Sequence, residues 1–164
     1  MVYRETLTVR SNDGIPTFHN VTAAAKEALQ RSGIQNGILS VYSHHTTCSV
    51  ITQEAAFDLS MTGLETLQVD FIEAFSSFLP ACRKEGMYLH PGPKALAFAA
   101  EHGEDARGCH NTDAHLRSAL VGRSENIAII DGQLDLGEYG YIYFVDFDTT
   151  RARTRQVQLT FLGE

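Results

Sequence analysis

The chain has 164 residues and is 43% hydrophobic and 20% charged, which is typical of one globular domain with a substantial core. Its net charge of −7 argues against a general nucleic-acid-binding protein, because such a protein needs a basic surface to release counterions. Three widely spaced cysteines, an N-terminus without an apolar signal region and the lack of any long apolar run predict a cytoplasmic protein with no disulfide framework and no membrane partner.

The N-terminal half of the chain predicts an alternation of strands and helices. Apolar and polar residues alternate over 2–10, which predicts a strand, and the alanine-rich run 22–30 predicts a helix. The stretch 37–52 is rich in Val, Ile, Thr and Tyr and predicts one long strand. A short helical stretch is expected over 54–59, and a longer helix over 63–79, where apolar residues recur at helical spacing.

The C-terminal half continues the same mixture. Short helices are predicted over 94–101 and 111–121, the second with a polar cap at its start. Strands are predicted over 127–130, 139–148 and 154–162. Antiparallel strands at both ends of the chain with helices between them indicate a single α+β domain over residues 1–164.

Four of the seven histidines lie in two short polar clusters, at 43–48 and 110–115. The first cluster follows a predicted strand and the second opens a predicted helix. Imidazole is the commonest metal ligand and the usual acid–base group near neutral pH. On a regular strand His44 and His45 point to opposite faces, so at most one of them enters a given pocket. The two clusters form a site only if the fold brings them together.

Two arginines near the C-terminus indicate an anionic neighbour. Arg153 and Arg155 share the strand parity of the apolar Val157, so both are predicted to point inward, where an unpaired charge is costly. Either an anionic ligand or a buried carboxylate would balance them. The planar donor fork of arginine suits phosphate, and the free N–H groups of a helix start near Asn111 also attract anions.

Simpler interpretations compete at each of these positions. Taken alone, His45 and His115 are more often ordinary hydrogen-bonded histidines than ligands, and His90 is consistent with either role. Cys48, within a predicted strand, is better interpreted as a small core residue than as a nucleophile. The run 109–111 holds Cys, His and Asn, but neighbours in sequence rarely reach the geometry of a protease triad.

Three sequence blocks, in order, resemble a known family pattern. Block 45–54 is similar to a His-Thr-Thr-Ala run that ends in Asn-Glu, with Cys48 in the place of Ala. Block 111–124 is similar to Asn-Ala-x-Ala-His-Leu followed by a helix and Gly-x-Ser. Block 132–137 is similar to a Gly-x-Leu-x-Leu-Gly hairpin, and 153–155 to the Arg-x-Arg that follows it. Together these blocks resemble the YjbQ-like proteins, a group often labelled secondary thiamine-phosphate synthase.

The resemblance implies an α+β fold with antiparallel or mixed sheets, helices packed between them and on one side, and assembly as a homotrimer. It also implies a pocket at the subunit edge where histidines hold a divalent metal or an anion. The activity it implies is weak thiamine-phosphate synthesis, which joins a pyrimidine pyrophosphate to a thiazole phosphate and releases pyrophosphate. The chain departs from the family at 138–140, which reads Glu-Tyr-Gly instead of Thr-Trp-Gln, and 81–108 is longer than in the shorter members.

These implications assign roles to individual residues. We expect His45, His90 and His115 to bind a divalent metal, for which zinc fits imidazole ligands and magnesium is the second option. The expected catalytic residues are His45, His115 and Glu54, with Glu54 orienting a ligand or acting as general base. The residues expected to bind the phosphate of a substrate are Thr46, Thr47, Asn111, Arg153 and Arg155.

Two other functions stay open at this point. A metal-dependent hydrolase of a small phosphorylated or acyl compound would use the same residues, with water as the nucleophile. A non-catalytic trimer would hold a small anion in the same pocket without turnover. A small phosphorylated molecule is the expected partner.

Overall fold

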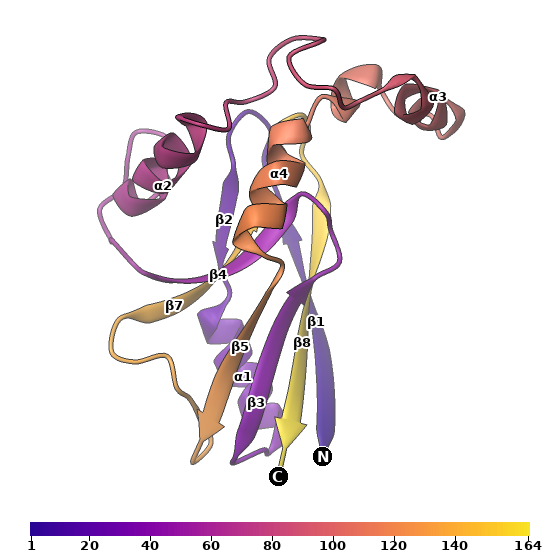
Figure 1. The fold of residues 1–164 in the computed structure, drawn as a ribbon. Helices are drawn as coiled ribbons and strands as arrows, with labels where there is room; N and C mark the ends of the chain where they lie inside the picture. Colours follow the sequence, from indigo (N-terminus) through magenta and orange to yellow (C-terminus); the bar gives the residue numbers. More distant parts are fainter.

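The computed structural model describes residues 1–164 and contains two antiparallel sheets and four α-helices, as the α+β expectation required. The five-stranded sheet has the order β1 (Val2–Arg10), β8 (Thr154–Gly163), β3 (Gly37–Ser43), β5 (Ser124–Ile130), β6 (Gln133–Leu134). The three-stranded sheet has the order β2 (Thr17–Asn20), β7 (Gly140–Asp146), β4 (Cys48–Glu54). Figure 1 shows both sheets, with the chain termini side by side at one end.

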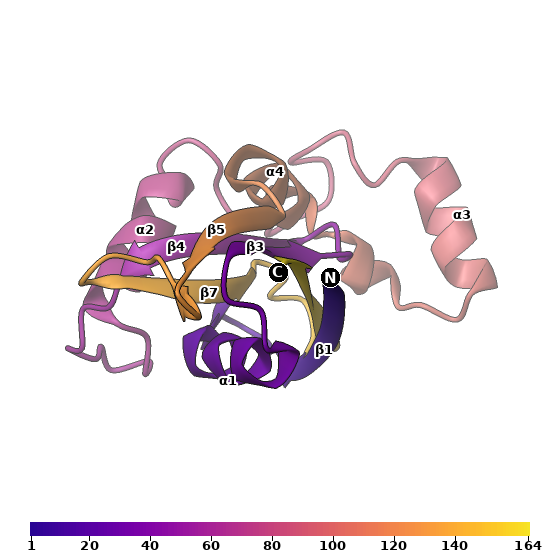
Figure 2. The ribbon, with the colours of Figure 1, turned by 90° about the horizontal axis from the view of Figure 1, so that it is seen from below.

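The helices have distinct positions around the sheets. They are α1 (Thr22–Ser32), α2 (Thr66–Ser76), α3 (Pro93–Glu101) and α4 (Thr112–Val121), with a short 3₁₀ helix η1 (Ala106–Cys109) before α4. Figure 2 shows α1 on one side of the sheets and α4 on the other, while α3 lies apart from the sheets at the periphery. No helix in the structure combines the length and apolar character that crossing a bilayer requires.

The main hydrophobic core lies between the two sheets and against α1. It contains Leu39 and Val41 of β3, Phe144 of β7 and Phe161 of β8, all with no exposed surface or almost none. A smaller cluster on the other face of the three-stranded sheet includes Val145 and packs against α2 and α4. The three-stranded sheet is therefore apolar on both faces, which explains why β7 has a continuous apolar sequence.

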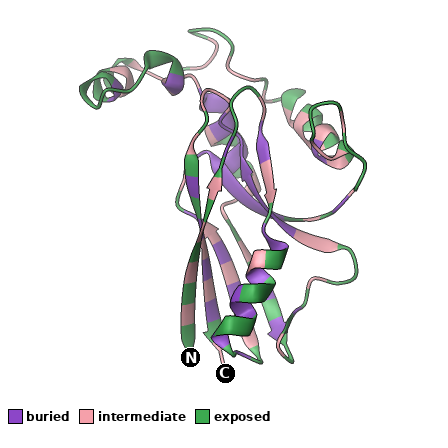
Figure 3. Cartoon of the chain, turned by 180° about the vertical axis from the view of Figure 1, so that it is seen from behind, coloured by how far each residue is buried: buried purple, intermediate pink, exposed green.

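The five-stranded sheet has one buried and one open face. Burial alternates along β8, whose even-numbered residues are exposed or partly exposed and whose odd-numbered residues from Arg155 to Phe161 are buried. Figure 3 shows this alternation on the strands, and a buried stripe along α1 that faces them. The period of two predicted for 154–162 is thus confirmed, and it places Arg155 on the core face.

Local sequence signals explain most helix boundaries. α1 ends at Gly33, which adopts φ 72° and donates its N–H to the carbonyls of Gln30 and Leu29. α2 begins after Glu65, which forms a capping box with Gln68. α3 begins with Pro93, which has no backbone N–H to leave unpaired.

Two sequence predictions are corrected by the structure. The stretch 37–52 is not one strand, because β3 and β4 belong to different sheets and residues 44–47 cross between them. The stretch 54–59 is not helical, and the chain there is irregular before α2. In both places residue propensity is overridden by tertiary pairing, since β4 pairs with β7 across the second sheet.

A second crossing runs beside the first. Residues 147–153 leave β7 of the three-stranded sheet and enter β8 of the five-stranded sheet. The two crossings are joined by a hydrogen bond of 3.1 Å from the Phe147 N–H to the Thr47 carbonyl. Both sheets therefore converge at one end of the molecule, and the start of α4 lies at the same end (Figure 1).

The alternation of burial along β8 predicts that truncating two adjacent side chains will lower the free energy of unfolding by very different amounts. Phe161→Ala removes a side chain with 0% exposure and should lower the free energy of unfolding by about 3–5 kcal/mol. Leu162→Ala, on the open face with 47% exposure, should cost less than about 1 kcal/mol. Urea denaturation of both variants measures the difference, and equal losses would contradict the assigned faces.

Candidate functional site

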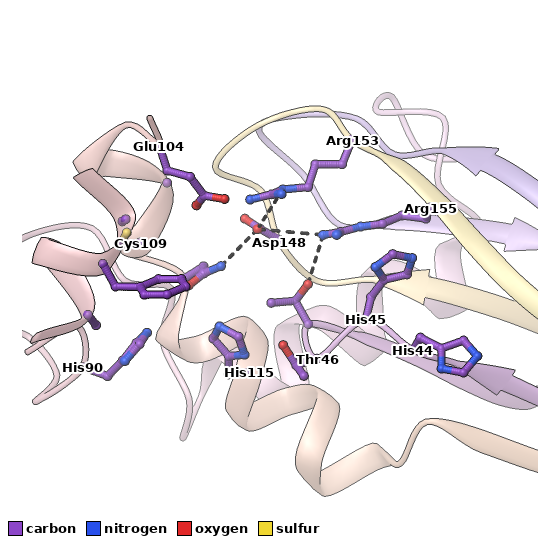
Figure 4. A pocket seen from close by; sticks show the side chains of 16 residues that line it. His44, His45, Thr46, His90, Glu104, Cys109, His115, Asp148, Arg153 and Arg155 are labelled. Atoms are coloured by element: carbon purple, nitrogen blue, oxygen red, sulfur yellow. Dashed lines mark hydrogen bonds and ion pairs between the residues drawn. The ribbon is translucent and has the colours of Figure 1, made fainter. Parts of the chain in front are cut away.

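A cavity of about 590 Å³ opens where the two sheet crossings meet α4 and the segment that carries α3 and η1. Figure 4 shows side chains from all of these segments pointing into one space. Every site residue expected from the sequence lines this cavity except Glu54. The two histidine clusters are therefore brought together, as the site hypothesis required.

Glu54 lies outside the cavity. It is the last residue of β4, at the opposite end of that strand from Cys48, and it pairs with Gly140 in the sheet. Its side chain is exposed. Because β4 runs away from the cavity, Glu54 is not positioned to orient a ligand in the cavity of its own chain, and the catalytic role expected for it stays a prediction.

Arg155 is balanced by a buried carboxylate that the sequence analysis did not single out. Its Nε donates to Asp146 Oδ2 at 2.6 Å, and its Nη2 donates to Thr47 Oγ1 at 3.1 Å. The two charged side chains are 7% and 0% exposed. Arg155 and Thr47 thus form the floor of the cavity, with most of their polar atoms already engaged.

Asp148 is the second carboxylate missing from the sequence prediction. It accepts hydrogen bonds from Asn111 Nδ2 at 3.1 Å and from the hydroxyl of Thr150 at 2.6 Å. Arg153 Nε and Arg155 Nη2 both lie 4.0 Å from its Oδ2. Dashed lines in Figure 4 mark these links between the crossing and the start of α4. The signal available in the sequence was the pair of acidic residues at 146 and 148, directly after an apolar strand.

Arg153 is the more weakly paired of the two arginines that line the cavity, since its one ion pair, with Asp148, is 4.0 Å long. Its backbone is fixed by the Ser11 hydroxyl, which accepts its N–H at 3.1 Å. Its side chain is 30% exposed, and its Nε makes no hydrogen bond. Glu104, which also lines the cavity, is paired with Arg151 at 2.9 Å instead. Arg153 is therefore a positioned guanidinium with unused donors.

His45 is held in one tautomer by the neighbouring strand. The backbone N–H of Gln156 donates to His45 Nε2 at 3.0 Å, so the ring proton of a neutral His45 lies on Nδ1. Partial burial and the nearby charge of Arg155 lower the pKa of His45, and Asp146 only partly opposes them. A neutral His45 therefore offers one N–H donor. His44 lines the rim and contacts Gln158 Oε1 at 2.6 Å.

His90 and His115 form a second pair of imidazoles. Their rings meet edge to face, with centroids 5.5 Å apart. Burial, with a smaller effect of His90, lowers the pKa of His115, although a hydrogen bond to the backbone of Thr46 opposes the shift. The carbonyl of His90 accepts the Thr112 hydroxyl at 2.7 Å, which ties the loop to α4. His115 is thus a neutral imidazole near pH 7, available to take up a proton.

The three histidines do not form a metal centre within one chain. No group of three or more His, Cys, Asp or Glu side chains is arranged to hold a metal ion. His45 Nε2 is occupied by the Gln156 amide, and His90 and His115 form a separate pair. The residues present therefore do not fit the zinc site expected from the resemblance, and the metal stays a prediction, as does the homotrimer.

The outer wall of the cavity was not foreseen from the sequence. It comes from α3 and η1 and includes Ala95, Phe98 and Cys109. Phe98 is 63% exposed and stacks on His102 with ring centroids 4.0 Å apart. The wall is attached through Arg151, which pairs with Glu104 and packs against Gly108. The cavity thus has a charged inner end and a partly apolar outer end.

Cys48 is a core residue, as its position in a strand predicted. It has no exposed surface, and burial raises the pKa of its thiol well above the usual value. The residues 109–111 do not form a triad, because Cys109 and Asn111 line the cavity while His110 does not.

Comparison with known proteins gives one consistent result. A family model described as UPF0047 protein YjbQ-like matches residues 5–164. A UPF0047 protein of Methanothermobacter thermautotrophicus is 28% identical over 96% of this chain and 92% of its own length. UPF0047 protein YugU of Bacillus subtilis is 27% identical over 85% of this chain and 86% of its own. The crystal structure of an uncharacterised YjbQ/UPF0047 protein of Clostridium acetobutylicum aligns with a TM-score of 0.69, 27% identity and coverage of 98% and 99%.

The buried ion pair predicts a large effect of truncating one partner. Arg155→Ala leaves the carboxylate of Asp146 buried without its charge partner and should lower the free energy of unfolding by about 3–5 kcal/mol. Arg151→Ala removes an exposed pair and should cost less than about 1 kcal/mol. Denaturant unfolding of both variants tests this, and a small loss for Arg155→Ala would show that the pair does not anchor the crossings.

Proposed function

The chain belongs to the YjbQ-like UPF0047 family, and on that premise we propose that its cavity binds a small phosphorylated molecule and transfers a group from it. The observation that carries the proposal is Arg153, which lines the cavity and whose Nε makes no hydrogen bond and lies 4.0 Å from its nearest carboxylate, Asp148. The carboxylates around it already have partners: Asp148 accepts from Asn111, and Glu104 pairs with Arg151. A phosphate is the natural partner for the remaining donors of Arg153.

Neighbouring groups extend this anion site. Neutral His45 presents its Nδ1–H, and Thr46 lines the same cavity. Asn111 is the residue before α4, where unpaired backbone N–H groups favour negative charge. Arg155 contributes positive charge from the floor, although its Nε and Nη2 already donate to Asp146. The phosphate therefore binds chiefly to Arg153 and the histidines.

His115 is the proposed proton acceptor. Its lowered pKa keeps the imidazole neutral at pH 7, which is the form that a general base requires. It lies across the cavity from Arg153 (Figure 4). The thiazole nitrogen attacks through its lone pair and has no proton to lose, so neutral His115 would take a proton from an amino group of the pyrimidine as pyrophosphate departs and return it once the carbon–nitrogen bond has formed. Arg153 would stabilise the negative charge that develops on the departing pyrophosphate.

The reaction we propose is the one that the family resemblance implies. A pyrimidine pyrophosphate would lose pyrophosphate as its carbon forms a bond with the nitrogen of a thiazole phosphate. The charged inner end of the cavity would receive the leaving pyrophosphate, and the partly apolar wall with Phe98 would contact a ring. No step of this proposal depends on a metal, because the histidines do not converge on one.

Arg153 gives a direct test of anion binding. Arg153→Ala should weaken binding of inorganic phosphate by about tenfold in calorimetric titration, because a charge-assisted hydrogen bond is lost. Arg153→Lys should retain part of the affinity. Arg4→Ala, an exposed arginine at the far end of β1, makes the same change of net charge and should bind like the unaltered protein. Unchanged phosphate affinity in Arg153→Ala would refute the proposed anion site.

His115 gives a test of catalysis. With pyrimidine pyrophosphate and thiazole phosphate, His115→Gln should lower the rate of pyrophosphate release by about 10²–10⁴. Because the pKa of His115 is lowered from 6.5, activity should persist at pH 6.5 and be lost only as the pH falls further. His19→Gln, outside the cavity, is the control. Phosphate release without a thiazole acceptor would indicate a hydrolase, and binding without turnover at any pH would indicate a non-catalytic anion-binding protein.

A further inference from the structure

A second hollow lies on the other side of the cavity wall. It has a volume of about 380 Å³ and is lined by residues of the loop after α2, of η1 and of the β7–β8 crossing. Neighbouring residues of the same two segments line the cavity and the hollow. Cys109 and Asn111 face the cavity, and His110 between them faces the hollow. Asp148 likewise faces the cavity, and Thr149 faces the hollow. We refer to this hollow as the basic groove.

The basic groove concentrates positive charge that has no protein partner. Arg83, Lys84 and Arg107 line it, and none of them takes part in an ion pair. Glu85 is the one acidic residue of the lining. The formal charge of the groove is thus about two units positive on a chain whose net charge is −7. Surface cations gathered in a concave site attract anions more strongly than scattered ones, because their potentials add.

The loop that supplies two of these cations is anchored to the body of the protein. The Cys82 N–H donates to Asp113 Oδ1 at 3.0 Å, and Asp113 is 7% exposed. Arg117 of α4 donates to the Leu79 carbonyl at 2.8 Å, just before the loop. The Tyr88 hydroxyl donates to the Pro80 carbonyl at 2.6 Å on its other side. Arg83 and Lys84 are therefore carried on a braced segment.

Polar groups complete the lining. Thr149 and Thr150 present hydroxyl-bearing side chains from the crossing, and His110 adds an imidazole. Thr150 is fixed by two hydrogen bonds to Asp148 Oδ1, from its N–H at 2.9 Å and its hydroxyl at 2.6 Å. Burial raises the pKa of Cys82, so its thiol is neutral near pH 7 and adds no negative charge. The groove offers mainly donors and cations.

We propose that the basic groove is a second anion-binding site, separate from the cavity, that takes a compact polyanion of the inorganic pyrophosphate class. Three cations against one carboxylate match a ligand with two or more negative charges. The Thr149 hydroxyl can donate to a phosphate oxygen, whereas the Thr150 hydroxyl already donates to Asp148. None of the cations of the groove lines the cavity, so the two hollows offer separate sets of charges to a small ligand. This site goes beyond the proposed function and does not require it.

The test separates the two sites with pyrophosphate as the probe. The Arg83→Ala/Arg107→Ala double variant should weaken one of two binding events about tenfold in calorimetric titration and leave the other unchanged. In ¹H–¹⁵N NMR spectra of the unaltered protein, pyrophosphate should shift the amide signals of Thr149 and Thr150, and these shifts should be lost in the double variant. Arg4→Ala/Arg10→Ala, with the same change of charge on β1, should behave like the unaltered protein.

Each outcome bears on one site. Loss of the Thr149 and Thr150 shifts in the double variant, with those shifts retained in Arg153→Ala, supports the groove whatever the fate of the proposed function. The same shifts and affinities in the double variant as in the unaltered protein would overturn the groove proposal, even if Arg153→Ala abolishes binding in the cavity. Thermal unfolding checks that the double variant is folded, which is expected because both arginines are exposed.

Discussion

The buried ion pair between Arg155 and Asp146 is the interaction on which the site depends. It joins the start of β8 in one sheet to the end of β7 in the other, and Thr47 of the first crossing binds the same guanidinium. Such a pair stabilises the fold little more than apolar side chains of similar volume would. It does specify how the two segments are positioned, because leaving either charge buried without its partner is costly. It therefore fixes the two crossings relative to each other. Asp148 extends that constraint to the start of α4 through Asn111.

Once the crossings are fixed, the remaining polar groups acquire distinct roles. Arg155 forms the buried ion pair with Asp146, whereas Arg153, two residues before it, keeps hydrogen-bond donors for a ligand. The Gln156 amide orients His45, and partial burial keeps His115 neutral. The cavity balances two arginines with two carboxylates, whereas the basic groove has three cations against one carboxylate. Both use the crossing at 147–153 as a wall, with Asp148 and Arg153 lining the cavity and Thr149 and Thr150 lining the groove.

Much of this arrangement was accessible from the sequence, and particular residues show where the sequence was insufficient. The period of two along β8 placed Arg153 and Arg155 inward, which was correct, but did not distinguish the paired arginine from the free one. The family resemblance assigned Glu54 a catalytic role, but the structure places this residue at the far end of β4, outside the cavity. Apart from the helix predicted over 94–101, the segment 81–108 has only a weak pattern, so the sequence did not predict the wall with Phe98 or the groove with Arg107. Both depend on contacts to α4 and to Arg151 rather than on local pattern.

The sequence by itself determined the class of fold, the faces of its strands and the residue types of the site, because these follow from local periodicity and composition. Only the tertiary structure decided which of those residues meet. Chain crossings between two sheets bring residues 45, 115 and 153 to one cavity and leave residue 54 at the far end of β4. The physical reason is that a partner such as Asp146 is chosen by pairing across the sheets and by the high cost of an unbalanced buried charge, and neither is encoded in the spacing along the chain.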